Sequence, residues 1–137
     1  MSEFEFTAPR AIFMPQRGYE DAYRTAYDLL VRRFPAEALS LIEPALAEDS
    51  DHRGLLTLRA WAYMLRAQLG RAEADLRALV ERDPSDAWAL HGLGRVLERQ
   101  FRPAEALGYL RLAAVMSDDY DHQAAVYRVE QQLARES

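Results

Sequence analysis

Small and large apolar residues recur along the chain at intervals of 34 residues. The columns of small residues are Ala26, Ala60, Gly94 and Ala38, Ala72, Ala106; the columns of large residues are Leu29, Tyr63, Leu97 and Ile42, Leu76, Leu110. Small side chains allow two helices to approach closely, and large side chains on the same seam fill its wider parts. The pattern therefore predicts three helical hairpins, at residues 19–52, 53–86 and 87–120.

Prolines support this register. The pentapeptide PAEAL occurs at residues 35–39 and again at 103–107, two periods later. It places Pro35 and Pro103 at the predicted first residue of a hairpin's second helix, where a missing N–H breaks no hydrogen bond. Pro44 falls inside a predicted helix, and we expect it to kink that helix on its outer face, where water replaces the lost bond.

Acidic residues mark the predicted helix starts. Asp51 and Asp121 stand in the junction sequences SDHR and YDHQ, and we expect each to cap the following helix by accepting a backbone N–H bond. Glu37, Glu73 and Glu105 are placed to complement the positive end of the helix dipole.

The first hairpin differs from the other two. Two columns that are apolar in the second and third hairpins contain Asp21 and Asp28 in the first. Because each unit of a repeat array buries a face against its neighbour, we expect no repeat before residue 19. The first hairpin is therefore predicted to be the cap of the array.

Residues 121–137 are predicted to form a single amphipathic helix. Val126, Val129 and Leu133 share one helical face, whereas the position of the small-residue column is occupied by Arg128. This segment is therefore predicted to be a closing helix that covers the apolar edge of the third hairpin.

Residues 1–18 precede the repeats. Pro9 and Pro15 oppose helix formation, which favours an extended, strand-like N-terminal arm. The apolar residues of this arm are Phe4, Phe6, Ile12, Phe13 and Met14. Two interpretations follow: the arm is a tail docked lightly on the body, or it occupies a groove in its own or a neighbouring chain.

The 34-residue period and its alanine columns resemble the tetratricopeptide repeat, a helix–turn–helix unit of the same length. Residues 87–120 match it best, with Leu90, Leu93, Gly94 and Leu97 ahead of Ala106 and Leu110. The chain departs from the family at Leu56 and Leu90, where Trp is usual, and at Ser50 and Asp118, where Pro is usual. The resemblance implies an all-α, right-handed solenoid of three hairpins, residues 19–137 with the closing helix. Divergent hairpins of another repeat family are the alternative.

In that family the first helices of the hairpins line a concave face that binds peptides. The residues predicted to form this face are Tyr23, Tyr27, Leu58, Trp61, Leu65, Trp88, His91, Arg95 and Arg99. Most are large and apolar although the hairpin seams do not require them, and clustered exposed apolar side chains usually mark an interaction site. The alternative is that the arm or the closing helix covers them and makes them part of the core.

Composition narrows the choice of partner. The 137 residues carry a formal charge of −5 without a basic block, so we expect neither a nucleic acid nor a membrane as partner. There is no cysteine, which excludes disulfides and thiolate chemistry. The N-terminus lacks the layout of a signal peptide and no apolar run is long enough to span a bilayer, so a cytoplasmic location is expected.

Catalytic chemistry is not expected. The histidines are His52, His91 and His122, and DDYDH at residues 118–122 is a weak metal signal. We therefore expect no enzyme, no cofactor and no metal, and predict a protein–protein interaction module that docks an apolar peptide or helix. The alternatives are a small chaperone for a secreted hydrophobic client, and a self-assembling homodimer in which the arm fills the groove.

Overall fold

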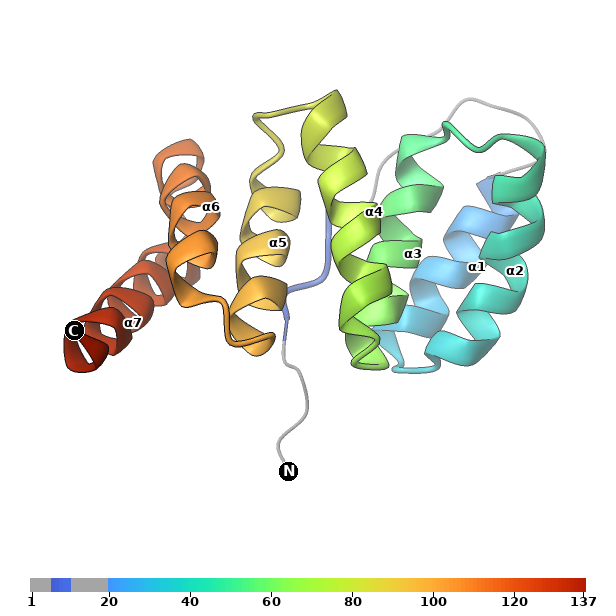
Figure 1. Ribbon diagram of the computed structural model, residues 1–137. Coiled ribbons are helices and arrows are strands. Elements are labelled where there is room, and N and C mark those ends of the chain that lie inside the picture. The colour runs from blue at the N-terminus through green and yellow to red at the C-terminus, as the bar shows by residue number, and fades with distance from the viewer. Residues whose placement is uncertain (1–5, 11–19) are drawn as a thin grey trace. The chain divides into compact units, whose positions relative to one another are not determined.

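A computed structural model describes residues 6–10 and 20–137, and within them it contains seven helices and no strands (Figure 1). The predicted all-α class is confirmed for this part of the chain. The helices are α1 (Glu20–Val31), α2 (Pro35–Glu48), α3 (Arg53–Leu65), α4 (Leu69–Arg82), α5 (Ala87–Arg99), α6 (Pro103–Met116) and α7 (Tyr120–Glu136). The chain divides into two compact units, Met1–Asp75 and Leu76–Ser137, and the boundary falls within α4.

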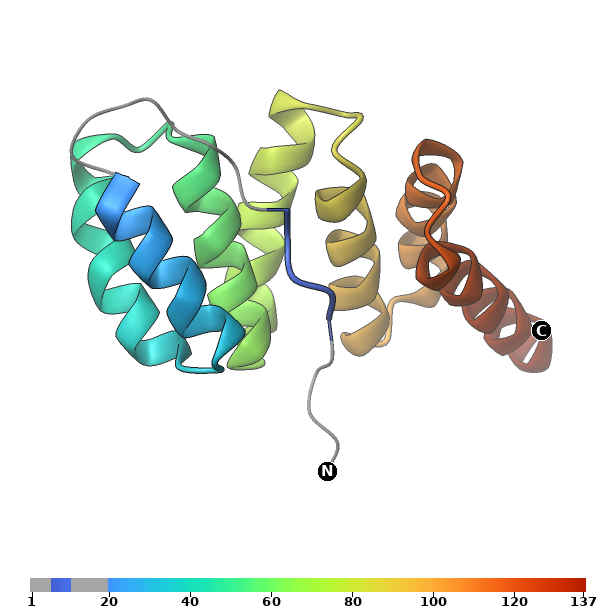
Figure 2. The ribbon, with the colours of Figure 1, turned by 180° about the vertical axis from the view of Figure 1, so that it is seen from behind.

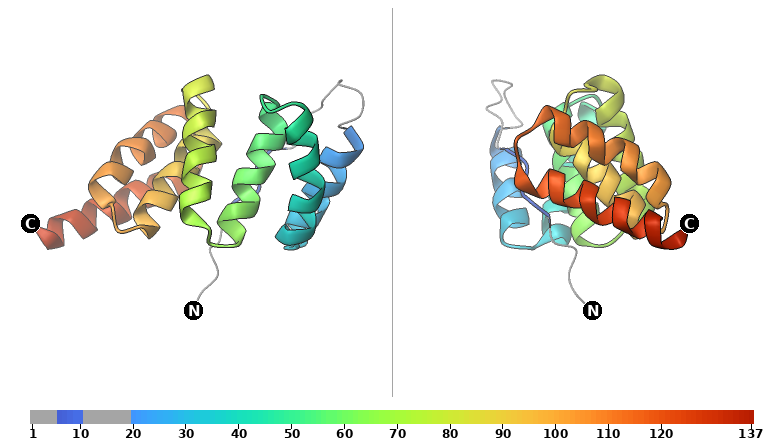
Figure 3. Two further views of the ribbon diagram at one scale, coloured as in Figure 1. Left: turned by 45° about the vertical axis from the view of Figure 1, so that its right-hand side comes forward. Right: turned by 90° about the vertical axis from the view of Figure 1, so that its left-hand side faces the viewer.

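Each unit is built from helices that pack on their neighbours in sequence. In the first unit α1 packs on α2, and α3 packs on both. In the second unit α5 packs on α6, and α6 packs on α7 (Figure 3). Residues 120–136 form one continuous helix, α7, as expected for this segment, with Val129 fully buried and Val126 and Leu133 half-buried.

The small-residue columns lie in the interior. Ala26, Ala38, Ala60, Ala72 and Ala106 are all fully buried, as are the large residues Ile42, Leu76, Leu97 and Leu110. The approach of α5 to α6 is especially close, because a Cβ atom added to Gly94 would lie 2.5 Å from the side chain of Leu110. The alternation of small and large positions therefore predicted core residues correctly except at Leu29, which is half-buried.

The turns that join α1 to α2, α3 to α4 and α5 to α6 have one geometry. Arg33, Ala67 and Phe101 adopt left-handed backbone conformations with φ of 65°, 55° and 63°. In each turn the following N–H bonds the carbonyl five residues earlier: Phe34 to Leu29, Gln68 to Tyr63 and Arg102 to Leu97. These bonds define a Schellman motif, in which glycine usually holds the left-handed position. The motif recurs every 34 residues without a glycine.

The prolines begin helices as predicted. Pro35 and Pro103 are confirmed as the first residues of α2 and α6, each with an acidic residue, Glu37 or Glu105, in the first turn. Pro44 lies inside α2 with its side chain exposed, and the helix continues through it.

The predicted N-caps at Asp51 and Asp121 are wrong. The N-cap of α3 is His52, whose Nδ1 accepts a 3.2 Å hydrogen bond from the N–H of Leu55. The N-cap of α7 is Asp119, whose Oδ1 accepts a 2.9 Å bond from the N–H of Asp121. The reason is that the cap immediately precedes the first helical residue, and the helices begin at residues 53 and 120.

Arg59 of α3 ties α2 and α4 together within the first unit. Its guanidinium donates two 2.9 Å hydrogen bonds to Asp75, from Nε to Oδ2 and from Nη2 to Oδ1, and lies 3.5 Å from Glu43 of α2. Burial raises the pKa of the Asp75 carboxyl, although the bonds from Arg59 act in the opposite direction. Asp75 is therefore an internal charge that depends on its arginine.

Candidate peptide-binding site

Three of the predicted site residues form an aromatic cluster in the first unit, which we define as Tyr23 and Tyr27 of α1 with Trp61 of α3. The ring centroids of Tyr23 and Tyr27 are 6.1 Å apart, and Tyr27 meets Trp61 edge to face at 5.6 Å. Tyr23 is 6% exposed and Trp61 is 3% exposed, whereas Tyr27 is half-buried. Tyr27 is therefore the member of the cluster most accessible to a ligand.

A residue of the N-terminal arm contacts this cluster. Residues 6–10 form neither a helix nor a paired strand, and Figure 2 draws them as a short dark blue tube. The hydroxyl of Tyr27 donates a 2.7 Å hydrogen bond to the carbonyl oxygen of Pro9. Pro9 is buried, while Thr7, Ala8 and Arg10 around it are exposed. The remaining apolar residues of the predicted arm, Phe4, Ile12, Phe13 and Met14, and Pro15 lie outside the described residues.

Trp61 has a polar atom that the cluster does not satisfy. Its Nε1 is buried and has no hydrogen-bond partner among the residues described. Leaving a buried donor without an acceptor costs roughly 1–3 kcal/mol. The Tyr27 hydroxyl of the cluster thus already holds a backbone carbonyl, whereas the Trp61 indole holds no acceptor among the described residues.

The other predicted site residues have mixed environments. In the first unit Leu58 is fully buried and Leu65 is half-buried. In the second unit Trp88, Arg95 and Arg99 are half-buried on α5, and His91 is 5% exposed. Four of the nine residues, Tyr23, Leu58, Trp61 and His91, are thus part of the interior in this structure.

His91 stacks on His122, a contact for which the sequence provided no signal. The ring centroids are 4.3 Å apart with an interplanar angle of 30°, and the pair joins α5 to α7. Burial is the main cause that lowers the pKa of His91 to about 3, and His122 and Arg95 repel a proton in the same direction. His91 is therefore neutral at physiological pH, and its ring packs against α7 through His122.

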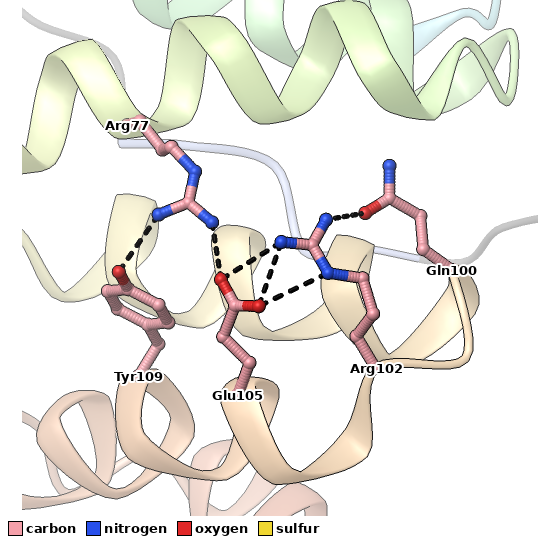
Figure 4. Close-up of polar contacts among 5 residues, drawn as sticks. All are labelled: Arg77, Gln100, Arg102, Glu105 and Tyr109. Carbon is pink, nitrogen blue, oxygen red and sulfur yellow. Dashed lines mark hydrogen bonds and ion pairs between the residues drawn. The ribbon is translucent and has the colours of Figure 1, made fainter.

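A polar network in the second unit surrounds Glu105, which belongs to the second PAEAL pentapeptide (Figure 4). Arg77 donates hydrogen bonds to Glu105 at 2.6 Å and to the Tyr109 hydroxyl at 3.0 Å, and Arg102 donates three further bonds to the Glu105 carboxylate. The bonds from Arg77 and then Arg102 lower the pKa of the Glu105 carboxyl. Glu105 thus joins α6 to α4, beyond the dipole role predicted for it.

A cavity of about 320 Å³ adjoins this network and is lined by Arg77, Val80, Glu81, Leu93 and Tyr109. The guanidinium of Arg77 is already bonded to Glu105 and Tyr109. The charged group of Arg77 at the cavity is therefore engaged by side chains of its own unit, which favours a structural role for the network.

Within residues 6–10 and 20–137, no group of three or more His, Cys, Asp or Glu side chains is arranged to hold a metal ion. No helix in the described part of the chain has the length and hydropathy needed to cross a membrane. Comparison with protein-family models gives no match, and comparison with curated protein sequences gives none either.

Proposed function

We propose that the chain is a helical-repeat protein of the tetratricopeptide type, a right-handed solenoid of three hairpins (α1–α2, α3–α4 and α5–α6) closed by α7. Two observations support this. The Schellman turn recurs at residues 33, 67 and 101, at the same interval as the sequence columns. The small residues of those columns are buried without exception. A 34-residue helix–turn–helix unit requires both features, a turn and a set of buried small residues that recur once per unit.

The proposed function is protein–protein interaction, in which the aromatic side chains of the first hairpin helices hold an apolar peptide or helix. The observation that carries this proposal is the hydrogen bond from Tyr27 to the Pro9 carbonyl, next to Trp61. This contact supports the proposal because an aromatic side chain with a polar tip holds the main chain of a non-helical segment, as in a peptide complex. A binding role is favoured over catalysis because the imidazoles of His91 and His122 are buried against each other.

A second candidate is self-assembly through the arm. It is favoured by the same contact, since Pro9 of the arm already accepts a hydrogen bond from Tyr27 of the aromatic cluster. In this reading the arm of one chain occupies the cluster of a neighbouring chain, and the homodimer has no other ligand at this site.

Site-specific photo-cross-linking in the source cells tests the interaction function. A photoreactive phenylalanine analogue would replace Tyr27, and in a control it would replace Ala47, an exposed residue of α2 in the same unit. We expect a different protein to be cross-linked at position 27 and not at position 47. Cross-links at position 27 that contain only this chain, in a species of twice its mass, would contradict the adaptor function and support self-assembly.

A further inference from the structure

The contact between residues 6–10 and the aromatic cluster has the features of a bound peptide. One residue, Pro9, is buried, and its exposed neighbours Ala8 and Arg10 flank it. Its carbonyl is held at 2.7 Å by a side-chain hydroxyl. Recognition of non-helical proline-containing segments uses this combination, an aromatic-lined site with a donor to the peptide carbonyl.

Proline suits this position for a physical reason. Any other residue buried here would carry an N–H that needs an acceptor, whereas proline has none and its φ is already restricted. Less conformational entropy is therefore lost when the segment is ordered. A buried proline with a bonded carbonyl leaves no polar group of that residue unsatisfied.

The indole N–H of Trp61 is a hydrogen-bond donor of the cluster that residues 6–10 do not bind. The Trp61 ring touches Tyr27, and its buried Nε1 lacks a hydrogen-bond partner among the described residues. A ligand that supplies an acceptor to this donor, in addition to the carbonyl that Tyr27 binds, would be held more tightly than the chain's own segment.

We propose that the cluster of Tyr23, Tyr27 and Trp61 is a binding site for a non-helical, proline-containing segment of a partner protein, and that residues 6–10 occupy it as an intramolecular competitor. This inference rests on the proposed interaction function and specifies its ligand. Because a tethered segment is present at a high effective concentration, the external peptide binds only to the fraction of molecules from which residues 6–10 have dissociated. Its apparent Kd is raised by the reciprocal of that fraction.

Fluorescence anisotropy with the full-length protein tests the proposal. The probes are a labelled peptide of sequence FTAPR, identical to residues 6–10, and a matched peptide FTAAR. The variant Pro9→Ala weakens the intramolecular segment, and Arg10→Ala, the exposed neighbouring residue, is the control. If residues 6–10 occupy the site in about nine molecules of ten, Pro9→Ala binds FTAPR about tenfold more tightly than the wild type, and Arg10→Ala stays within about twofold.

Two further results are expected. FTAAR binds Pro9→Ala at least about tenfold more weakly than FTAPR does. Tyr27→Phe in the Pro9→Ala background, which keeps the ring and loses only the hydroxyl, weakens FTAPR binding by about two- to tenfold. Equal binding of FTAPR to the wild type and to folded Pro9→Ala, or equal binding of FTAPR and FTAAR, overturns the proposal.

A second measurement does not depend on the folding of any variant. In the wild-type protein, saturating FTAPR should shift the indole N–H resonance of Trp61, which a spectrum of Trp88→Phe assigns. An unmoved Trp61 resonance at saturation overturns the site. A solution mass of twice 15.7 kDa that falls to that of one chain in Pro9→Ala also overturns it, since the occupant is then the arm of a second copy.

The two proposals fail separately. Cross-linking of a partner at position 27 without any binding of FTAPR refutes the proline-peptide site and leaves the interaction function standing. Binding of FTAPR in solution, with position 27 cross-linked only within its own chain in cells, supports the site and refutes the adaptor function.

Discussion

A methyl group at position 94 is predicted to destabilise the second unit. An ideal Cβ there would lie 2.5 Å from both Cγ and Cδ2 of Leu110 and 3.3 Å from the carbonyl oxygen of Ala106. Leu110 is fully buried and cannot move into solvent. Overpacking of a core costs about 1–3 kcal/mol, whereas exchanging a helical glycine for alanine recovers only about 0.5–1 kcal/mol. Gly94→Ala should therefore lower the free energy of unfolding by about 1–2 kcal/mol.

Gly108 provides a matched control on the helix that faces Gly94. It lies inside α6, it is exposed, and an added Cβ would meet no atom within 4 Å. Only the helix-propensity term remains, so Gly108→Ala should raise the free energy of unfolding by about 0.5–1 kcal/mol. The same substitution on two packed helices is thus expected to have opposite signs.

Urea denaturation followed by far-ultraviolet circular dichroism measures both effects. With a slope of about 2 kcal/mol per molar urea, the midpoint should fall by about 0.5–1 M for Gly94→Ala and rise by about 0.3–0.5 M for Gly108→Ala. If Gly94→Ala matches or exceeds the wild-type midpoint while Gly108→Ala behaves as expected, α5 and α6 do not approach as closely as the structure has them. The reasoning from the small-residue column would then be refuted.

Three further predictions concern other features. Phe101→Gly should raise the free energy of unfolding by about 1 kcal/mol in urea denaturation, because glycine relieves a left-handed φ of 63° at a side chain that is 87% exposed; no gain would contradict that strain. Asp75→Asn should lower it by about 2 kcal/mol, because it leaves the partly buried Arg59 with only the longer contact to the carboxylate of Glu43. An unchanged midpoint would argue against that dependence. The pKa of His91 is about 3 in the folded chain, against an ordinary histidine value of 6.5. Between pH 3 and pH 6.5 the folded state therefore binds fewer protons than the unfolded state. The contribution of the neutral His91 to the free energy of unfolding is fully present above pH 6.5. It is lost as the pH falls towards 3, by at most about 1.4 kcal/mol per pH unit. His91→Gln should flatten this dependence in denaturation series at several pH values, and an equally steep slope would disprove the assignment.

Much of the core could be predicted from the 34-residue period. The alanine columns, Leu97 and Leu110 are buried as expected, because equivalent positions of similar successive units face the same kind of neighbour. Helix starts at Pro35 and Pro103 were also predictable, since proline tolerates the first helical position and opposes later ones. The repeat spacing and the positional preference of proline can be read from the sequence, because neither depends on which distant groups meet in the fold.

The helix ends show where local rules were insufficient. His52 and Asp119 cap helices for which Asp51 and Asp121 were predicted, because the choice among adjacent polar residues depends on where the helix begins. The left-handed turns at Arg33, Ala67 and Phe101 carry no glycine to mark them. The hydrogen bonds of the Schellman turns stabilise this conformation against the local preference.

The sequence by itself therefore determined the helical class, the 34-residue period, and most of the residues that are buried at its small and large positions. The tertiary structure alone decided that Trp61 and Leu58 are interior residues, that His91 stacks on His122, and that the Tyr27 hydroxyl binds the Pro9 carbonyl. The physical reason is sequence distance. Helix periodicity is a local property, whereas Tyr27 and Pro9 are 18 residues apart and His91 and His122 lie on different helices. Only the folded chain brings such groups into contact, and no regular spacing in the sequence predicts these contacts.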